Sequence, residues 1–254
     1  MALEVQLTGG TLTTVTRIGD TVHRPCARGS DGVHLLLQHL EREGFAGAPR
    51  FLGFDADKRE ILSFLEGTVA NWPWPQVLCE DSGLQQIGTW LKTFHESSAR
   101  FHPPQDLIWN DETKLDKPGQ IILQGDPGPW NMIWKEGKLV GFIDFDFAHP
   151  GNPIDEVLET IWHIAPLYID EFRQQAGVAH IDRLHRANNL LEAYGTNLRF
   201  ENEKKLAQAV LDFATRQRQA CAERAKLGIE PWVTLVGRWA ENDKKWIWLK
   251  DKAL

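Results

Sequence analysis

A segment of 23 residues, from Gln124 to Asp146, constrains this chain more than any other part of its sequence. It reads QGDPGPWNMIWKEGKLVGFIDFD and holds Asp126, then Asn131 five residues later, and Asp144 after an apolar run. Magnesium-dependent phosphoryl transfer requires a carboxylate beside the attacking hydroxyl and oxygen ligands for the metal ion. The segment therefore predicts a site for this chemistry.

The middle of the segment predicts a β-hairpin. Two apolar runs flank a polar turn over Lys135–Lys138, which is the pattern of two strands joined by a tight turn. Pairing outward from this turn sets Asn131 against Phe142 and makes Asp144 the diagonal neighbour of Asn131 on one face. Diagonal neighbours lie roughly 7–8 Å apart, close enough for both side chains to bind one Mg²⁺ ion, which prefers oxygen ligands.

Asp126 precedes the hairpin in a loop that contains Pro127 and Pro129. These prolines stiffen the backbone, which suits a carboxylate with a fixed direction of approach. Turns also favour Asp, Asn, Gly and Pro for structural reasons, so each residue by itself indicates little. The functional interpretation depends on three oxygen-bearing side chains and two strands falling together in one short segment.

The segment resembles the catalytic and metal-binding loops of the aminoglycoside phosphotransferase family, small-molecule kinases with a protein-kinase-like fold. The resemblance implies that Asp126 is the catalytic base and that Asn131 and Asp144 bind Mg²⁺. Asp144 matches the aspartate of the kinase Asp-Phe-Gly motif. The family often has His where this chain has Gln124, a side chain that can also hydrogen-bond the backbone and so support the loop.

Composition limits the class of protein without naming a reaction. The chain has 254 residues and a net charge of −7, which argues against general binding to nucleic acids or membrane surfaces and suits a cationic substrate. Its three cysteines are far apart, so they predict neither a disulfide framework nor a zinc site. No signal sequence or apolar stretch of roughly 18 residues is present, and we expect a cytoplasmic protein.

The first 66 residues predict a small, strand-rich lobe. A helix with an apolar stripe within Val33–Leu40 interrupts the strands. Under the resemblance, residues 1–66 form the nucleotide-binding lobe and residues 67–254 the catalytic and substrate lobe of a bilobal α+β protein-kinase-like fold. The predicted strands cover Glu4–Leu7, Leu12–Ile18, Thr21–Arg24, Phe51–Phe54 and Glu60–Leu65.

From about Asp81 onward the sequence predicts mostly helices, interrupted by the hairpin. The Trp-rich segment Pro231–Leu254 is expected to pack on the larger lobe. The other predicted helices after the hairpin cover Ile154–Ala165, Ile169–Ala176, Ile181–Tyr194 and Glu201–Leu227.

Two groups in the small lobe are candidates for binding the nucleotide. Gly9 and Gly10 stand between two predicted strands, where glycine lets the backbone approach phosphates closely; a plain turn is the alternative. Phe64, Leu65 and Glu66 lie at the junction with the second lobe. In the family, backbone groups at this junction hydrogen-bond the adenine.

Arg24, at the end of the third predicted strand, is the candidate cation for the α- and β-phosphates. Kinase-like proteins usually have lysine there, paired with a glutamate of the neighbouring helix. Arginine can bind phosphate oxygens bidentately, so it is a plausible substitute, and a solvated cation at a strand end is the alternative. The predicted helix holds its acids at Asp31, Glu41 and Glu43, none of which is a mid-helix partner.

Carboxylates also follow the hairpin. Pro153 suits the first position of a helix, and the helix dipole favours Asp155 in its first turn. The resemblance implies that Asp155 braces the catalytic loop. Asp146 and Glu159 are candidates for contact with the substrate, with a plain helix-surface charge as the alternative for Glu159.

The expected activity is ATP- and Mg²⁺-dependent transfer of the γ-phosphoryl group to a hydroxyl of a small molecule, such as an aminoglycoside. Hydrolase, P-loop and dinucleotide-binding motifs are absent. The alternative is a catalytically weak kinase-like protein that binds, or gives immunity to, an antibiotic or peptide toxin. That alternative fits Gln124 and the missing Lys–Glu pair. The acceptor, the choice between ATP and GTP, and the oligomeric state stay open.

Overall fold

The described part of the chain forms two compact units, and all of its strands belong to the first. The computed structural model describes residues 4–7, 14–175, 177–238 and 246–254. The predicted lobe boundary after residue 66 stays a prediction. Within the described residues, the first unit comprises Met1–Val69, Thr93–Asp126 and Asn131–Pro153, and the second comprises Ala70–Lys92, Pro127–Trp130 and Ile154–Leu254.

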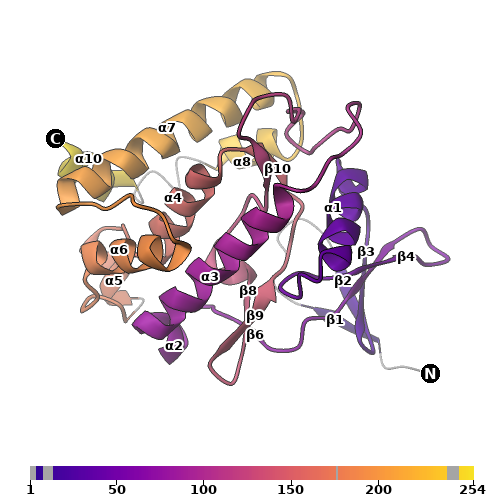
Figure 1. Cartoon of the computed structure of the whole chain (residues 1–254), viewed down its shortest axis with the longest axis horizontal. Coiled ribbons are helices and arrows are strands. Elements are labelled where there is room, and N and C mark those ends of the chain that lie inside the picture. Colours follow the sequence, from indigo (N-terminus) through magenta and orange to yellow (C-terminus); the bar gives the residue numbers. More distant parts are fainter. Residues whose placement is uncertain (1–3, 8–13, 176, 239–245) are drawn as a thin grey trace. The chain divides into compact units, whose positions relative to one another are not determined.

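A five-stranded antiparallel sheet begins the first unit, with strand order β1-β2-β3-β5-β4 (Figure 1). The predicted order of three strands, a helix and two strands is confirmed. Two predicted strands are longer than those observed, and residues 12 and 13 lie outside the described residues. The elements are β1 (Glu4–Leu7), β2 (Val15–Ile18), β3 (Thr21–Arg24), α1 (Ser30–Arg42), β4 (Phe51–Phe54) and β5 (Glu60–Ser63).

The apolar stripe of α1 lies in the core of the first unit. Leu36, Leu37 and Leu40 are almost completely buried, as their spacing on one helix face predicts. Burying a leucine side chain contributes about 1.5–3 kcal/mol, so this face fixes α1 firmly. The N-terminus of α1 has no such support from a side chain. Its N-cap residue, Gly29, has a left-handed backbone conformation and makes no side-chain hydrogen bond to the helix.

The predicted hairpin is confirmed. Glu136 and Gly137 form its two-residue turn with φ of 51° and 74°, as a type I′ turn requires. Strand β6 pairs with β8 of this hairpin, which gives a three-stranded sheet of order β6-β8-β9. Strands β7 and β10 pair with each other in a separate two-stranded sheet. The elements are β6 (Thr68–Val69), β7 (Ile121–Leu123), β8 (Met132–Lys135), β9 (Lys138–Phe142) and β10 (His149–Gly151).

The predicted pairing of Asn131 with Phe142 is wrong. A bulge adds one residue to β9, so Met132 lies opposite Phe142. Asn131 instead accepts a hydrogen bond at its backbone oxygen from the Ile143 N–H (2.9 Å). Because the side-chain period of a strand is two residues, this shift removes the argument that Asn131 and Asp144 share a face as diagonal neighbours.

Helices make up most of the second unit, as predicted for the chain after Asp81 (Figure 1). Helices α8 and α10 of the Trp-rich C-terminal segment both pack on α7, which confirms that expectation. Among the described residues, no helix has the length and apolar character needed to cross a membrane. The helices are α2 (Gln76–Cys79), α3 (Asp81–Ser98), α4 (Pro153–Ile164), α5 (Asp170–Gln175), α6 (Arg183–Tyr194), α7 (Glu203–Lys226), α8 (Trp232–Gly237) and α10 (Ile247–Ala253).

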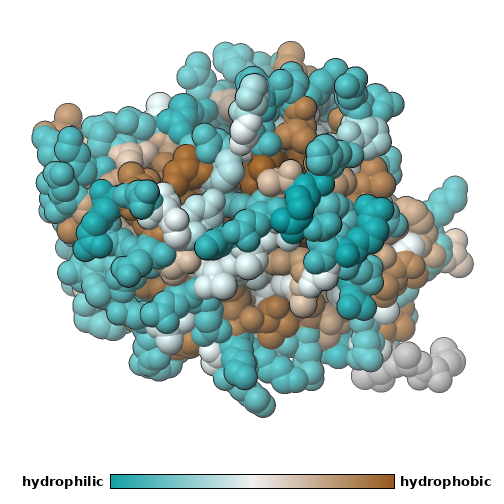
Figure 2. All heavy atoms as spheres, viewed as in Figure 1, coloured by the Kyte–Doolittle hydropathy of each residue, from teal (hydrophilic) through white to brown (hydrophobic). Residues whose placement is uncertain are grey.

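The face drawn in Figure 2 is largely hydrophilic, with hydrophobic residues between the polar ones. The large apolar side chains that are exposed come from several separate elements, among them Leu52 and Phe54 of β4 and Val233 of α8. Singly exposed apolar residues are normal on soluble proteins. The exposed apolar side chains that the structure describes therefore do not by themselves indicate a site.

Asp55, in the turn between β4 and β5, has two hydrogen-bonding partners, one histidine and one arginine. His23 Nδ1 donates a hydrogen bond to Asp55 Oδ2 (2.9 Å), and Arg59 Nε donates to the same oxygen (2.8 Å). Hydrogen bonds from His23 first, and then from Arg59, hold the pKa of Asp55 well below its usual value. The ionised carboxylate therefore stabilises the folded state.

We expect Asp55→Asn to lower the urea midpoint of unfolding at pH 7. A carboxylate with a depressed folded-state pKa stabilises the protein above its unfolded pKa of about 3.9, and this contribution is lost as pH falls through the folded value. The difference between wild type and variant should be constant above about pH 5 and shrink below about pH 4. Urea titrations across this range measure it, and a difference that grows on acidification would contradict the assignment.

Candidate active site

Gln124 joins the loop after β7 to the segment after β9. Its side chain is fully buried. Its Nε2 donates to the backbone oxygens of Ile143 (2.9 Å) and Asp144 (2.8 Å), and its Oε1 accepts a hydrogen bond from the Asp126 N–H (2.8 Å). One amide thus fixes the backbone of both Asp126 and Asp144, so glutamine makes the backbone contacts expected of it at this position.

Gly125 allows the same two segments to approach closely. Its φ is +87°, and a Cβ added there would lie 2.0 Å from the backbone oxygen of Phe147. Side chains rarely adopt this conformation, and the clash is with backbone, which cannot turn aside. A glycine is therefore required between Gln124 and Asp126.

Asn131 and Asp126 are in direct contact. Asn131 lies at the end of η1 (Pro129–Asn131) and is buried. Its Nδ2 donates to the backbone oxygen of Asp126 (2.9 Å) and to Asp126 Oδ2 (2.8 Å). An amide has one nitrogen donor group and one oxygen acceptor, so this arrangement leaves the Asn131 oxygen as the atom that suits a cation.

Arg24, at the end of β3, connects three carboxylates. Its Nε donates to Glu60 Oε1 (2.6 Å), its Nη1 donates to Asp144 Oδ1 (3.0 Å), and its Nη2 donates to Asp146 Oδ1. Arg24 is only 7% exposed. The alternative of a solvated cation at a strand end is therefore wrong.

The charges around Arg24 do not balance. One guanidinium faces three carboxylates, an excess of two negative charges when all four groups are ionised. Burial works against the charge on Arg24, but Asp146, Glu60 and Asp144 outweigh it and raise the pKa of Arg24. Burial raises the pKa of Asp146 to about 6 despite the opposing charge of Arg24, with Asp144 adding to the rise. A divalent cation would offset this excess charge.

The backbone of Asp144 has a conformation that is uncommon for a residue with a side chain. Its φ is +59°, which costs of order 1–3 kcal/mol and persists only where neighbours enforce it. Gln124 holds its backbone oxygen and Arg24 holds its carboxylate. The side chain is still 44% exposed, so a ligand can reach it.

The donor atoms fit Mg²⁺. Asp144 offers a carboxylate and Asn131 an amide oxygen, and hard oxygen donors are those that Mg²⁺ prefers. The protein normally supplies only one or two of them, with water and phosphate oxygens completing the octahedron. The chemistry of these two donors suits the ion, and binding of Mg²⁺ by Asn131 and Asp144 stays a prediction.

Three residues of this region were not among those predicted. Glu60 of β5 binds Arg24, His34 of α1 binds Glu60 (Nε2 to Oε2, 2.6 Å), and Asn110 Nδ2 donates to the backbone oxygen of Asp146 (2.9 Å). The sequence gives one signal for Glu60, an acid at the first position of a strand whose next two residues are apolar. We find no such signal for His34 or Asn110.

Phe64, Leu65 and Glu66 follow β5 directly. The Phe64 N–H donates to the backbone oxygen of Asp20 (2.9 Å), so this donor is already occupied. Glu66 is exposed and accepts a hydrogen bond from Lys135 Nζ (2.6 Å). Contact of this junction with adenine stays a prediction, and the Phe64 N–H is its least suitable donor.

The remaining predicted residues are Asp155 and Glu159 of α4 and the pair Gly9 and Gly10. Asp155, in the first turn of α4, accepts a hydrogen bond from Arg216 of α7 (2.7 Å), and its support of the catalytic loop stays a prediction. Glu159 of α4 is half-buried, and its contact with a substrate also stays a prediction. Gly9 and Gly10 lie outside the described residues.

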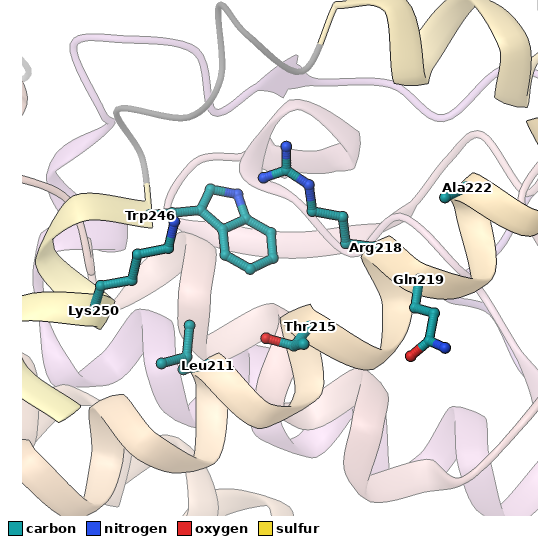
Figure 3. Close-up of a pocket in the computed structure, with 7 residues that line it drawn as sticks. All are labelled: Leu211, Thr215, Arg218, Gln219, Ala222, Trp246 and Lys250. Carbon is teal, nitrogen blue, oxygen red and sulfur yellow. The ribbon is translucent and has the colours of Figure 1, made fainter. Parts of the chain in front are cut away.

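A separate pocket of about 410 Å³ lies between α7 and the C-terminal segment (Figure 3). Arg218 lies over the ring of Trp246, 5.2 Å from its centre. Among the described residues that line it are two cations, Arg218 and Lys250, and no acid, which does not favour a cationic acceptor there. It is lined by Leu211, Thr215, Arg218, Gln219, Ala222, Trp246 and Lys250, none of them a predicted site residue.

Comparison with known sequences identifies the family. The model of the phosphotransferase enzyme family, APH, matches residues 108–190. The trifolitoxin immunity protein of Rhizobium leguminosarum bv. trifolii is 33% identical over 253 residues, which cover 96% of this chain and 94% of that protein. The chain belongs to the aminoglycoside phosphotransferase family.

Two solved structures have a similar fold. A choline/ethanolamine kinase family protein from Mesorhizobium loti superposes with a TM-score of 0.58 at 11% identity, over 99% of this chain and 92% of that one. An amicoumacin kinase in complex with AMP-PNP, Ca²⁺ and Ami superposes with a TM-score of 0.61 at 9% identity, over 98% and 87%. The predicted α+β protein-kinase-like fold is confirmed.

Proposed function

We propose that this protein is an ATP- and Mg²⁺-dependent phosphotransferase that moves the γ-phosphoryl group to a hydroxyl of a small molecule. The observation that carries the proposal is the excess of two negative charges around Arg24, which includes the exposed carboxylate of Asp144. A divalent ion offsets such an excess, and it is also what a triphosphate brings to a kinase site.

Each residue of the network has a role in this proposal. Asp126 orients or deprotonates the acceptor hydroxyl, and Asn131 and Asp144 hold Mg²⁺. The ion, when bound, neutralises charge on the phosphates. Arg24 binds the α- and β-phosphates; three of its five N–H groups bind carboxylates among the described residues, leaving two donors. Asp146 keeps Arg24 directed towards Asp144.

The proposal also includes contacts to the adenine, the catalytic loop and the acceptor. Backbone groups at Leu65 and Glu66 bind the adenine, and Asp155 braces the catalytic loop. The net charge of −7 favours a cationic acceptor, such as an aminoglycoside. Glu159 is the candidate for contact with that acceptor.

Thermal unfolding with ATP, in the presence and absence of Mg²⁺, tests the proposal. A ligand at 100 times its Kd stabilises the folded state by about 2.7 kcal/mol, which raises Tm by roughly 5–10 °C for a chain of this size. We expect most of this rise to require Mg²⁺. A Tm that ATP does not change, or that ATP raises equally in EDTA, would contradict a magnesium-dependent kinase.

A second candidate function is immunity to an antibiotic or peptide toxin by binding alone. The observation that favours it is the 33% identity to a trifolitoxin immunity protein over nearly the whole chain. Expression of the wild type and of Asp126→Asn in toxin-sensitive cells separates the two candidates. Protection that survives this substitution favours binding, and protection that is lost with it favours phosphorylation.

A further inference from the structure

We propose that Glu60 of β5, itself held by His34 of α1, is the residue that positions Arg24 for the nucleotide phosphates. The inference rests on the proposed function, because it assumes that Arg24 binds phosphate. In kinase-like proteins, a glutamate of the neighbouring helix pairs with the cation that binds the phosphates. In this chain a strand residue, Glu60, pairs with Arg24.

The pairing of β3 with β5 brings the two residues together. The strands are antiparallel neighbours, and Arg24 and Glu60 are direct partners in their register. Directly opposed residues have Cβ atoms about 4.5–5.5 Å apart, so the side chains meet with little reach, and Arg24 Nε lies 2.6 Å from Glu60 Oε1. The backbone hydrogen bonds of the sheet therefore fix this ion pair.

His34 occupies the second oxygen of the same carboxylate. Its Nε2 lies 2.6 Å from Glu60 Oε2, and its ring stacks on Phe51 of β4 with 3.8 Å between ring centres. Glu60 is 1% exposed and His34 is 6% exposed. With both oxygens bound and the imidazole held by stacking, the carboxylate of Glu60 cannot rotate away from Arg24.

This arrangement sets the direction of the guanidinium. Because Glu60 takes the Nε–H, both Nη groups of Arg24 are directed towards Asp144 and Asp146. Burial opposes ionisation of Glu60, but the hydrogen bond from His34 and the charge of Arg24 outweigh it and hold the pKa of Glu60 below its usual value. Glu60 thus stays negatively charged and keeps Arg24 in place at neutral pH.

The fixed register has a consequence for regulation. In protein kinases, the position of the helix that carries the glutamate controls whether the ion pair is formed. Here the carboxylate comes from the same sheet as Arg24, so a shift of α1 would remove His34 from Glu60 but would not separate Glu60 from Arg24. The ion pair between Arg24 and Glu60 therefore does not depend on the position of α1.

A metal site is the competing use of these side chains. Ligand atoms of Cys26, His34 and Glu60 lie within 4.8 Å of one another. Both oxygens of Glu60 are already bound, one of them to the cation Arg24, which disfavours a second cation beside it. The geometry therefore points to the hydrogen-bonded network.

The test compares the affinity for ATP with Mg²⁺ to the affinity for adenosine, which lacks phosphates. In Glu60→Gln we expect the Kd for ATP to rise about tenfold or more and the Kd for adenosine to change less than twofold. A merely structural role would weaken both ligands together. Isothermal titration gives both constants, and thermal unfolding shows whether the variant is folded.

Asp55→Asn is the matched control. Asp55, like Glu60, binds one histidine and one arginine, His23 and Arg59, beside the same sheet, and neither contacts Asp144 or Asp146 among the described residues. The ratio of the two Kd values should equal that of the wild type. Cys26→Ser should also leave the ratio unchanged; a loss of ATP affinity there would replace the positioning role with a metal site.

His34→Gln keeps the test decisive if Glu60→Gln does not fold, because it leaves the ion pair with Arg24 intact. We expect an intermediate rise in the Kd for ATP, about threefold, with adenosine again unaffected. A folded variant of either kind with an unchanged ratio would overturn the positioning role alone. A wild type that binds no ATP with Mg²⁺ would instead overturn the proposed function.

Discussion

Asp126→Asn is expected to lower the rate of phosphoryl transfer by about 10²–10⁴-fold, the usual contribution of a general base. Binding of ATP should persist, because no nucleotide contact is assigned to this carboxylate. Asparagine keeps the shape of the side chain, and its oxygen can still accept the hydrogen bond from Asn131 Nδ2 (2.8 Å in the wild type). Transfer of labelled γ-phosphate to an acceptor, or to water, measures the rate.

Asp116→Asn serves as the control for this experiment. Asp116 is an exposed aspartate of the same compact unit, in the loop that precedes β7, and its removal changes the net charge by the same amount. Its rate should equal that of the wild type. If Asp126→Asn keeps more than about one tenth of the wild-type rate, Asp126 is not the general base.

Local patterns in the sequence predicted the elements of the fold well. The strands Thr21–Arg24 and Phe51–Phe54 are observed with the predicted bounds. Turn residues flank them, Gly19 and Asp20 before the first and Asp55–Lys58 after the second. The helix beginning at Pro153 is also observed as predicted. Signals of this kind depend on neighbours in the chain, and these are visible in a single sequence.

Contacts between distant segments could not be predicted in the same way. Arg24 finds Glu60 because β5, and not the next strand along the chain, lies beside β3. The bulge in β9 likewise depends on packing, and it moved Asn131 out of the predicted register. The predicted set of site residues thus lacked the acid that holds Arg24.

Gln124 shows the limit of comparing motifs. Its departure from the histidine that is common in the family favours a weakened site. In the structure it makes three hydrogen bonds that fix Asp126 and Asp144 together. An amide offers both a donor and an acceptor, and this pair of functions is what the position requires, so the loop geometry gives no reason to infer inactivity.

Asp144→Ala is expected to remove the Mg²⁺-dependent part of the stabilisation by ATP. The substitution deletes an oxygen ligand and reduces the excess negative charge around Arg24 from two charges to one. The rise in Tm that depends on Mg²⁺, roughly 5–10 °C in the wild type, should fall to less than about 2 °C. Binding of ATP in EDTA should be equal or tighter, because a charge that repels the phosphates is gone.

Alanine changes the backbone at this position as well as the charge, since Asp144 has φ of +59°. Asparagine tolerates this conformation better than alanine does and keeps one oxygen in place of the carboxylate. Asp144→Asn therefore isolates the effect of charge, and we expect a Mg²⁺-dependent rise in Tm between those of the wild type and Asp144→Ala. If Asp144→Ala keeps the full Mg²⁺-dependent rise, the ion is held elsewhere. If only Asp144→Ala loses it, the ion requires the side-chain oxygen or the backbone conformation at this residue, and not its charge.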